Sequence, residues 1–178
     1  MPNQVSGLGA LTQASISLSS TDAFIAVGRF MYFWSRLEHS IDLAISNITG
    51  LIPTEYIAFT SKQGVDGKLG IIKYFENYYV IDGNTRHNLK IFLKKIENIK
   101  NFRNSICHSP FIPNDDGTVT IYEIKMSKGR IVNKKNVWDS RKFESMNNEI
   151  IELVTQIKTI ADVIAIDKSY ITKNAGSL

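Results

Sequence analysis

The stretch Asn101–Pro110 reads NFRNSICHSP and closes a long segment with a helical pattern. Apolar side chains recur through this segment at the i, i+3/i+4 spacing of a helix, at Leu89, Phe92, Ile96, Ile99, Phe102 and Ile106. Because Ser109 precedes a proline, helical geometry is disfavoured there, and the helix is expected to end near His108. The stretch therefore predicts a core helix whose end carries an arginine and a histidine, a pair that an apolar core does not require.

Three more helices are expected before this one. Their predicted ranges are about Asp22–Thr49, Pro53–Ser61 and Lys68–Val80, each with apolar residues at helical spacing. The polar run Ser19–Asp22 can cap the first of them, and Gly50 with Pro53 ends it. The residues Asp82–Thr85 supply a turn and a cap for the central helix.

After Pro110 the pattern changes from helical spacing to alternation. Thr118–Ile124 is rich in β-branched residues and follows an Asp-Gly turn, and a second strand is expected at about Arg130–Val137. Asp139 and Ser140 then precede a last helix. The predicted fold class is all-α, a bundle of four to five helices with a small β-hairpin, at about residues 117–138, between the central and last helices.

Length and composition fit one globular domain. The chain has 178 residues, of which 43% are hydrophobic and 21% charged. We expect the domain to span about 22–166, between an N-terminal tail (1–21) and a C-terminal tail (167–178). With one cysteine, Cys107, no export signal and no long apolar run, we expect a reducing, cytoplasmic location and no membrane association.

The basic residues are unevenly distributed. The segments Arg86–His108 and Lys125–Lys142 hold six and seven of the 21 lysines and arginines, each with a single acidic residue. Such clustering favours a polyanionic partner such as nucleic acid, although two solvated faces would explain it as well. No Cys/His/Asp spacing indicates a zinc site, so no metal or cofactor is expected.

At this point the sequence resembles a known family. The run from Arg103 to His108 is similar to the HEPN signature, in which an arginine is followed by four to six residues, the first of them polar, and then a histidine. The segment Trp34–Glu38 resembles the first helix of small bacterial HEPN proteins, and the hairpin and closing helix are similar too. The resemblance covers about 22–166, but only the Arg-Asn-x-x-x-His stretch is specific.

The resemblance implies a helical bundle that forms a homodimer and brings two Arg–His pairs into one groove. Catalytic members of the family are metal-independent endoribonucleases, so Arg103 and His108 would be catalytic and RNA would be the partner. It also suggests a toxin or an antiviral defence effector, with an antitoxin or another regulatory protein as a further partner.

The chemistry of these residue types suits that role. Histidine can act as acid or base near neutral pH, and arginine can grip phosphate oxygens. We expect Asn104, Lys100 and Ser109 to help bind the substrate, and Glu38 either to orient Arg103 or to lie on the helix surface as an ordinary carboxylate. On an ideal helix the arginine and the histidine lie about 140° apart, so the sequence predicts local unwinding at His108.

Other interpretations remain open. A basic pair at a helix C-terminus is also favoured by the helix dipole alone. Cys107 is expected to pack in the interior, and Trp34 and Tyr78–Tyr79 are expected in the core rather than stacked on bases. The alternative functions are a non-catalytic HEPN-like module that dimerises or binds a nucleotide or a partner protein, and a helical nucleic-acid binder without chemistry.

Overall fold

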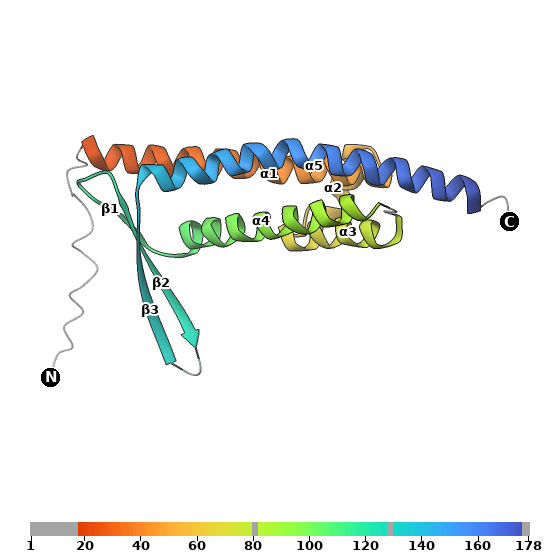
Figure 1. Cartoon of the computed structure of the whole chain (residues 1–178). Coiled ribbons are helices and arrows are strands. Elements are labelled where there is room, and N and C mark those ends of the chain that lie inside the picture. The colour runs from red at the N-terminus through yellow and green to blue at the C-terminus, as the bar shows by residue number, and fades with distance from the viewer. Residues whose placement is uncertain (1–17, 80–81, 128–129, 176–178) are drawn as a thin grey trace.

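The computed structural model describes residues 18–79, 82–127 and 130–175 (Figure 1). These residues form five helices and one small sheet. In chain order the elements are α1 (Leu18–Thr49), α2 (Pro53–Thr60), α3 (Val65–Tyr79), α4 (Gly83–His108), β1 (Phe111–Pro113), β2 (Val119–Ser127), β3 (Arg130–Trp138) and α5 (Ser140–Ala175). The predicted all-α class, with a small antiparallel sheet between the central and last helices, is confirmed.

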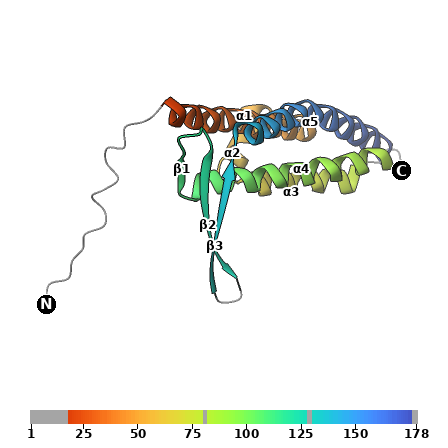
Figure 2. The ribbon, with the colours of Figure 1, turned by 60° about the vertical axis from the view of Figure 1, so that its left-hand side comes forward.

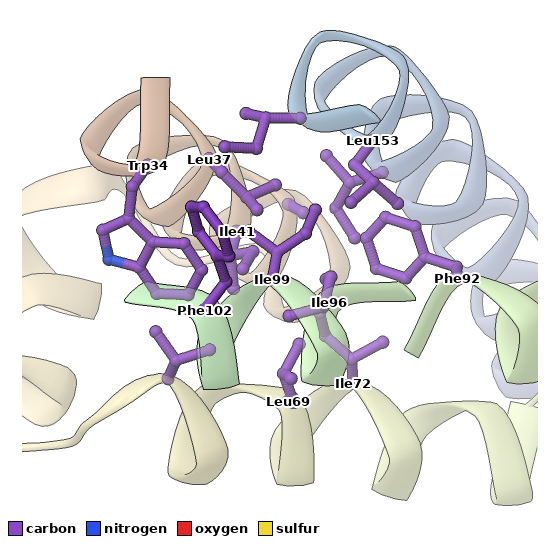
Figure 3. Packing of buried hydrophobic residues seen from close by; sticks show 14 of the residues in the cluster. Trp34, Leu37, Ile41, Leu69, Ile72, Phe92, Ile96, Ile99, Phe102 and Leu153 are labelled. Carbon is purple, nitrogen blue, oxygen red and sulfur yellow. The ribbon is translucent and has the colours of Figure 1, made fainter. Parts of the chain in front are cut away.

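The helices form two layers. The long helices α1 and α5 run side by side, and α4 and α3 lie against them (Figures 1 and 2). Apolar side chains from all four helices meet between the layers, as Figure 3 shows for Leu37 of α1, Leu153 of α5, Ile99 of α4 and Ile72 of α3. Burial of this apolar surface is what holds the layers together.

Local signals set several helix ends. Gly50 adopts a left-handed φ of 78°, and its N–H donates to Ser46 O at 2.9 Å, which closes α1. At the start of α4, Asp82 Oδ2 accepts from the Thr85 N–H at 2.8 Å. This hydrogen bond and that of the Thr85 hydroxyl lower the pKa of Asp82. α4 ends where predicted, because Ser109 is extended before Pro110.

The sheet has the strand order β1-β2-β3 and is antiparallel throughout. The β2–β3 hairpin was predicted, whereas the short edge strand β1 was not, since its two flanking prolines mask any strand pattern. Gly117, at φ 78°, allows the turn that joins β1 to β2. The hairpin leaves the helical layers near the C-terminal end of α4 and projects away from them (Figure 2).

Two boundaries differ from the prediction. α1 begins at Leu18, so Ser19–Asp22 lie within its first turns instead of capping it from outside. Contacts with β1 support this end of α1, where the Phe24 and Phe111 rings are 5.9 Å apart. The part of the predicted N-terminal tail at 1–17 lies outside the described residues.

At the other end, α5 continues to Ala175 through most of the segment predicted to be a tail. Lys168 Nζ donates to the carbonyl oxygens of Ile48 and Thr49 at 3.1 and 3.2 Å, and so ties this part of α5 to the last turn of α1. None of the helices in the described ranges combines the length and the apolar character needed to cross a bilayer.

Candidate active site

The arginine and the histidine of the motif lie together at the C-terminal end of α4. Arg103 Nη1 is 3.5 Å from His108 Nε2 and donates to Asn104 Oδ1 at 3.2 Å. Arg103 is half-buried, and its Nε finds no acceptor in the described part of the chain, whereas His108 is exposed. The three side chains form one polar cluster around the last turns of the helix.

The predicted unwinding at His108 is wrong. α4 stays helical through His108, and the backbone becomes extended only at Ser109. A separation of five residues is about 7.5 Å along a helix axis. The long arginine side chain spans this distance and reaches around the helix, so the two groups meet without a change in the backbone.

A groove of about 700 Å³ opens beside this cluster, between the C-terminal half of α4 and the β2–β3 hairpin. The helix contributes polar side chains to its lining, namely those of Asn98, Asn101, Asn104, Ser105 and His108. The hairpin contributes Glu123, Ile124, Lys134, Asn136 and Trp138, and the lining is completed by Phe102 and Ser109. One wall of the groove is therefore the end of α4 that carries the motif, and the other wall is the hairpin, which follows later in the sequence.

A polar contact and an aromatic contact help to hold the hairpin against α4. Ser105 Oγ lies 2.5 Å from Glu123 Oε1, and Glu123 is 8% exposed. The rings of Phe102 and Trp138 stack with centroids 4.0 Å apart and planes inclined by 20°. Together these contacts connect the helix to both strands of the hairpin and fix the width of the groove.

Of the other predicted site residues, two line the groove and two do not. Asn104 and Ser109 line the groove with His108, as a substrate-binding role requires. Lys100 points elsewhere, because its Nζ pairs with Asp66 Oδ1 on α3 at 2.6 Å. Glu38 is half-buried on α1, and among the described residues no hydrogen bond or ion pair joins it to Arg103.

Several groove residues were not predicted. Asn98, Asn101 and Ser105 share one face of α4 with His108. Successive members of this set are three or four residues apart, a helical spacing that is visible in the sequence. Glu123 faces the groove as the cross-strand neighbour of Lys134. Its position depends on how the hairpin packs on α4, and no local pattern reports that packing.

Two packing predictions are corrected. Cys107 is exposed rather than buried, with its Sγ 3.8 Å from Met31 Sδ, because it lies beside the buried face of α4 that carries Ile106 and not on it. Tyr78 is also exposed, on the outer side of α3 against Tyr74. Trp34 is buried as expected. Within the described residues no group of His, Cys, Asp and Glu side chains is arranged to hold a metal ion.

Comparisons of this chain with protein-family models, with curated proteins and with solved structures find no match. A function is therefore inferred from the geometry of the site and from the resemblance of its motif.

Proposed function

We propose that this chain is a metal-independent endoribonuclease of the HEPN type, a toxin or antiviral defence effector, which acts as a homodimer through Arg103 and His108. The observation that carries the proposal is the 3.5 Å approach of Arg103 Nη1 to His108 Nε2, because His108 lines an open polar groove. An acid–base group thereby borders the groove, and a permanent cation lies directly beside it.

RNA cleavage needs little more than these groups. The 2′-OH of the ribose attacks the adjacent phosphorus while a base takes its proton, the P–O5′ bond breaks, and an acid protonates the departing oxygen. The products are a 2′,3′-cyclic phosphate and a 5′-hydroxyl. Arg103 would stabilise the charge that builds up on the phosphate oxygens. Its contacts with Asn104 and His108 use Nη1 and its Nε is buried, so the N–H groups of Nη2 remain as donors.

The need for two proton transfers supports the dimer. His39 and His87 are exposed on other parts of the helices, so one histidine borders the described groove. A second copy would bring a second His108, and the two could serve as base and acid.

Exposed cations beside the groove favour a polyanionic substrate. Lys134 on β3 is exposed and belongs to the lining, and Arg130 is exposed on the same face of the strand, toward the tip of the hairpin. Basic side chains placed along a strand can hold a phosphate backbone next to the reacting phosphate.

The test is cleavage of RNA in EDTA by the full chain and by His108→Ala. We expect wild type to leave 2′,3′-cyclic phosphate ends and the variant to lose at least about a hundredfold in rate, as is typical when a general acid or base is removed. The matched control is His87→Ala, since His87 is exposed on the same helix outside the groove. Full activity of His108→Ala would overturn the proposal.

Two observations favour the second candidate, a non-catalytic HEPN-like module that dimerises or binds a nucleotide or partner protein. Arg103 Nη1 is already shared between Asn104 and His108, and a groove of about 700 Å³ has the size of small-molecule pockets. A wild-type chain that dimerises and binds mononucleotides but cleaves no RNA would support this candidate instead.

A further inference from the structure

The groove is lined by an unusual number of carboxamides. Asn98, Asn101 and Asn104 come from α4, and Asn136 comes from β3 on the opposite wall. Each carboxamide offers one acceptor oxygen and two N–H donors. Asn104 is engaged with Arg103, whereas no side-chain hydrogen bond is made by the other three within the ranges that the structure describes.

This lining indicates which part of a ligand it would contact. A phosphate is best held by cations and an aliphatic ligand by apolar walls, whereas neutral carboxamides match groups that donate and accept at once. The edges of nucleobases have this character, and adenine in particular pairs with a carboxamide through its N6 donor and N7 acceptor.

The groove also offers an aromatic surface. Trp138 is half-buried in the lining, and Phe102 stacks on it and holds it in place. Nucleobases stack on aromatic side chains whatever their identity, while edge hydrogen bonds distinguish them. Both contacts require an unpaired base, because the bases of an RNA duplex are stacked and their edges are hard to reach.

We propose that this groove binds unpaired nucleobases next to the phosphate at Arg103 and His108, and that Asn98, Asn101 and Asn136 select adenine among them. The inference rests on the proposed function and names its substrate class, single-stranded RNA that is read by base as well as by backbone. The two sides of the groove contribute together, since the asparagines belong to α4 and to the hairpin.

The test is the binding of short 2′-O-methyl oligonucleotides of A, C or U, which cannot be cleaved through a 2′-OH, measured by fluorescence anisotropy. We expect wild type to bind the adenine oligomer roughly tenfold more tightly than the others, the discrimination typical of one good carboxamide–base pair. The triple variant Asn98→Ala/Asn101→Ala/Asn136→Ala should bind all three oligomers equally. Asn104 is left unchanged because it contacts Arg103.

The control is Asn88→Ala, since Asn88 is exposed on α4 away from the groove and its loss should leave the preference intact. Alanine is a better helix former than asparagine, so loss of α4 would not explain an effect of the triple variant. Equal binding of the three oligomers by wild type, or an unchanged preference in the triple variant, overturns the inference. In that case His108-dependent cleavage would still uphold the nuclease.

The reverse result is equally informative. An adenine preference that disappears in the triple variant, in a protein that cleaves no RNA, upholds base selection by the groove and overturns the nuclease proposal. The binding and cleavage measurements therefore separate the failure of one proposal from the failure of the other.

Discussion

The two faces of α4 carry different kinds of residues, and only one of the two is explained by packing. The inner face carries six apolar residues that are all buried, from Leu89 to Ile106. The face toward the groove carries three asparagines within seven residues, Asn98, Asn101 and Asn104, although asparagine is a poor helix former. Packing explains the inner face, and Asn104 accepts a hydrogen bond from Arg103. No such contact within the described residues offsets the low helix propensity of Asn98 and Asn101. Where a local rule is broken without a structural gain, a function is the natural explanation.

The largest expected effect is the loss of stability on Phe102→Ala, on the inner face of α4. The Phe102 ring contacts three other aromatic rings. Its centroid lies 4.9 Å from that of Phe30, 4.0 Å from that of Trp138 and 5.5 Å from that of Phe143. The side chain therefore packs α4 against α1, β3 and α5. Removing it should lower the free energy of unfolding by about 3–5 kcal/mol, because transfer energy and packing are lost together. Urea denaturation followed by circular dichroism measures the change.

The neighbouring substitution Asn101→Ala serves as the control, since it alters the same turn on the groove side. It should leave the free energy of unfolding within about 0.5 kcal/mol of wild type. If Phe102→Ala cost no more than Asn101→Ala, the two faces would not differ in the way proposed.

A smaller effect is expected at the contact between the two walls of the groove. Ser105→Ala removes the hydroxyl that lies 2.5 Å from the buried carboxylate of Glu123. We expect a loss of about 1–2 kcal/mol in the free energy of unfolding, because a hydrogen bond to a charged group is worth about 1.5–3 kcal/mol and alanine returns only about 0.5 kcal/mol in helix propensity. The same denaturation experiment measures it.

The matched control is Ser40→Ala, whose hydroxyl donates to Arg36 O within its own helix. That change should cost less, since no partner on another element is lost. In a Glu123→Gln background the effect of Ser105→Ala should shrink, because the acceptor is no longer charged. An equal cost in both backgrounds would show that the contact does not hold the hairpin to α4.

The comparison also explains which features could be predicted from the sequence. The inner face of α4 is a periodic signal, and Leu89, Ile96 and Phe102 are buried as their spacing predicts. The arginine and the histidine were found because the motif is local. Periodicity gives the direction of a side chain around its own helix, but not the element that it meets.

The direction of Lys100 shows this limit. Lys100 was expected near the phosphate, but it pairs with Asp66, which is 34 residues away in the sequence. Glu123 was missed for the same reason, since its place in the groove depends on the packing of the hairpin. Similarly, α5 extends past its predicted end, and Lys168 in this extension donates to the end of α1, which is 120 residues away in the sequence.

The smallest expected effect is on the groove face itself, at Asn98→Ala. The side chain of Asn98 is exposed, and within the described chain it makes no hydrogen bond that the change would remove. Because alanine favours the helix by roughly half a kcal/mol over asparagine, the variant should unfold at a slightly higher temperature than wild type. It should at the same time weaken binding of the adenine oligomer, so that stability and binding change in opposite directions. A variant that is less stable than wild type would show that Asn98 supports the helix, and the argument that the groove face is shaped by its ligand would then fail at this position.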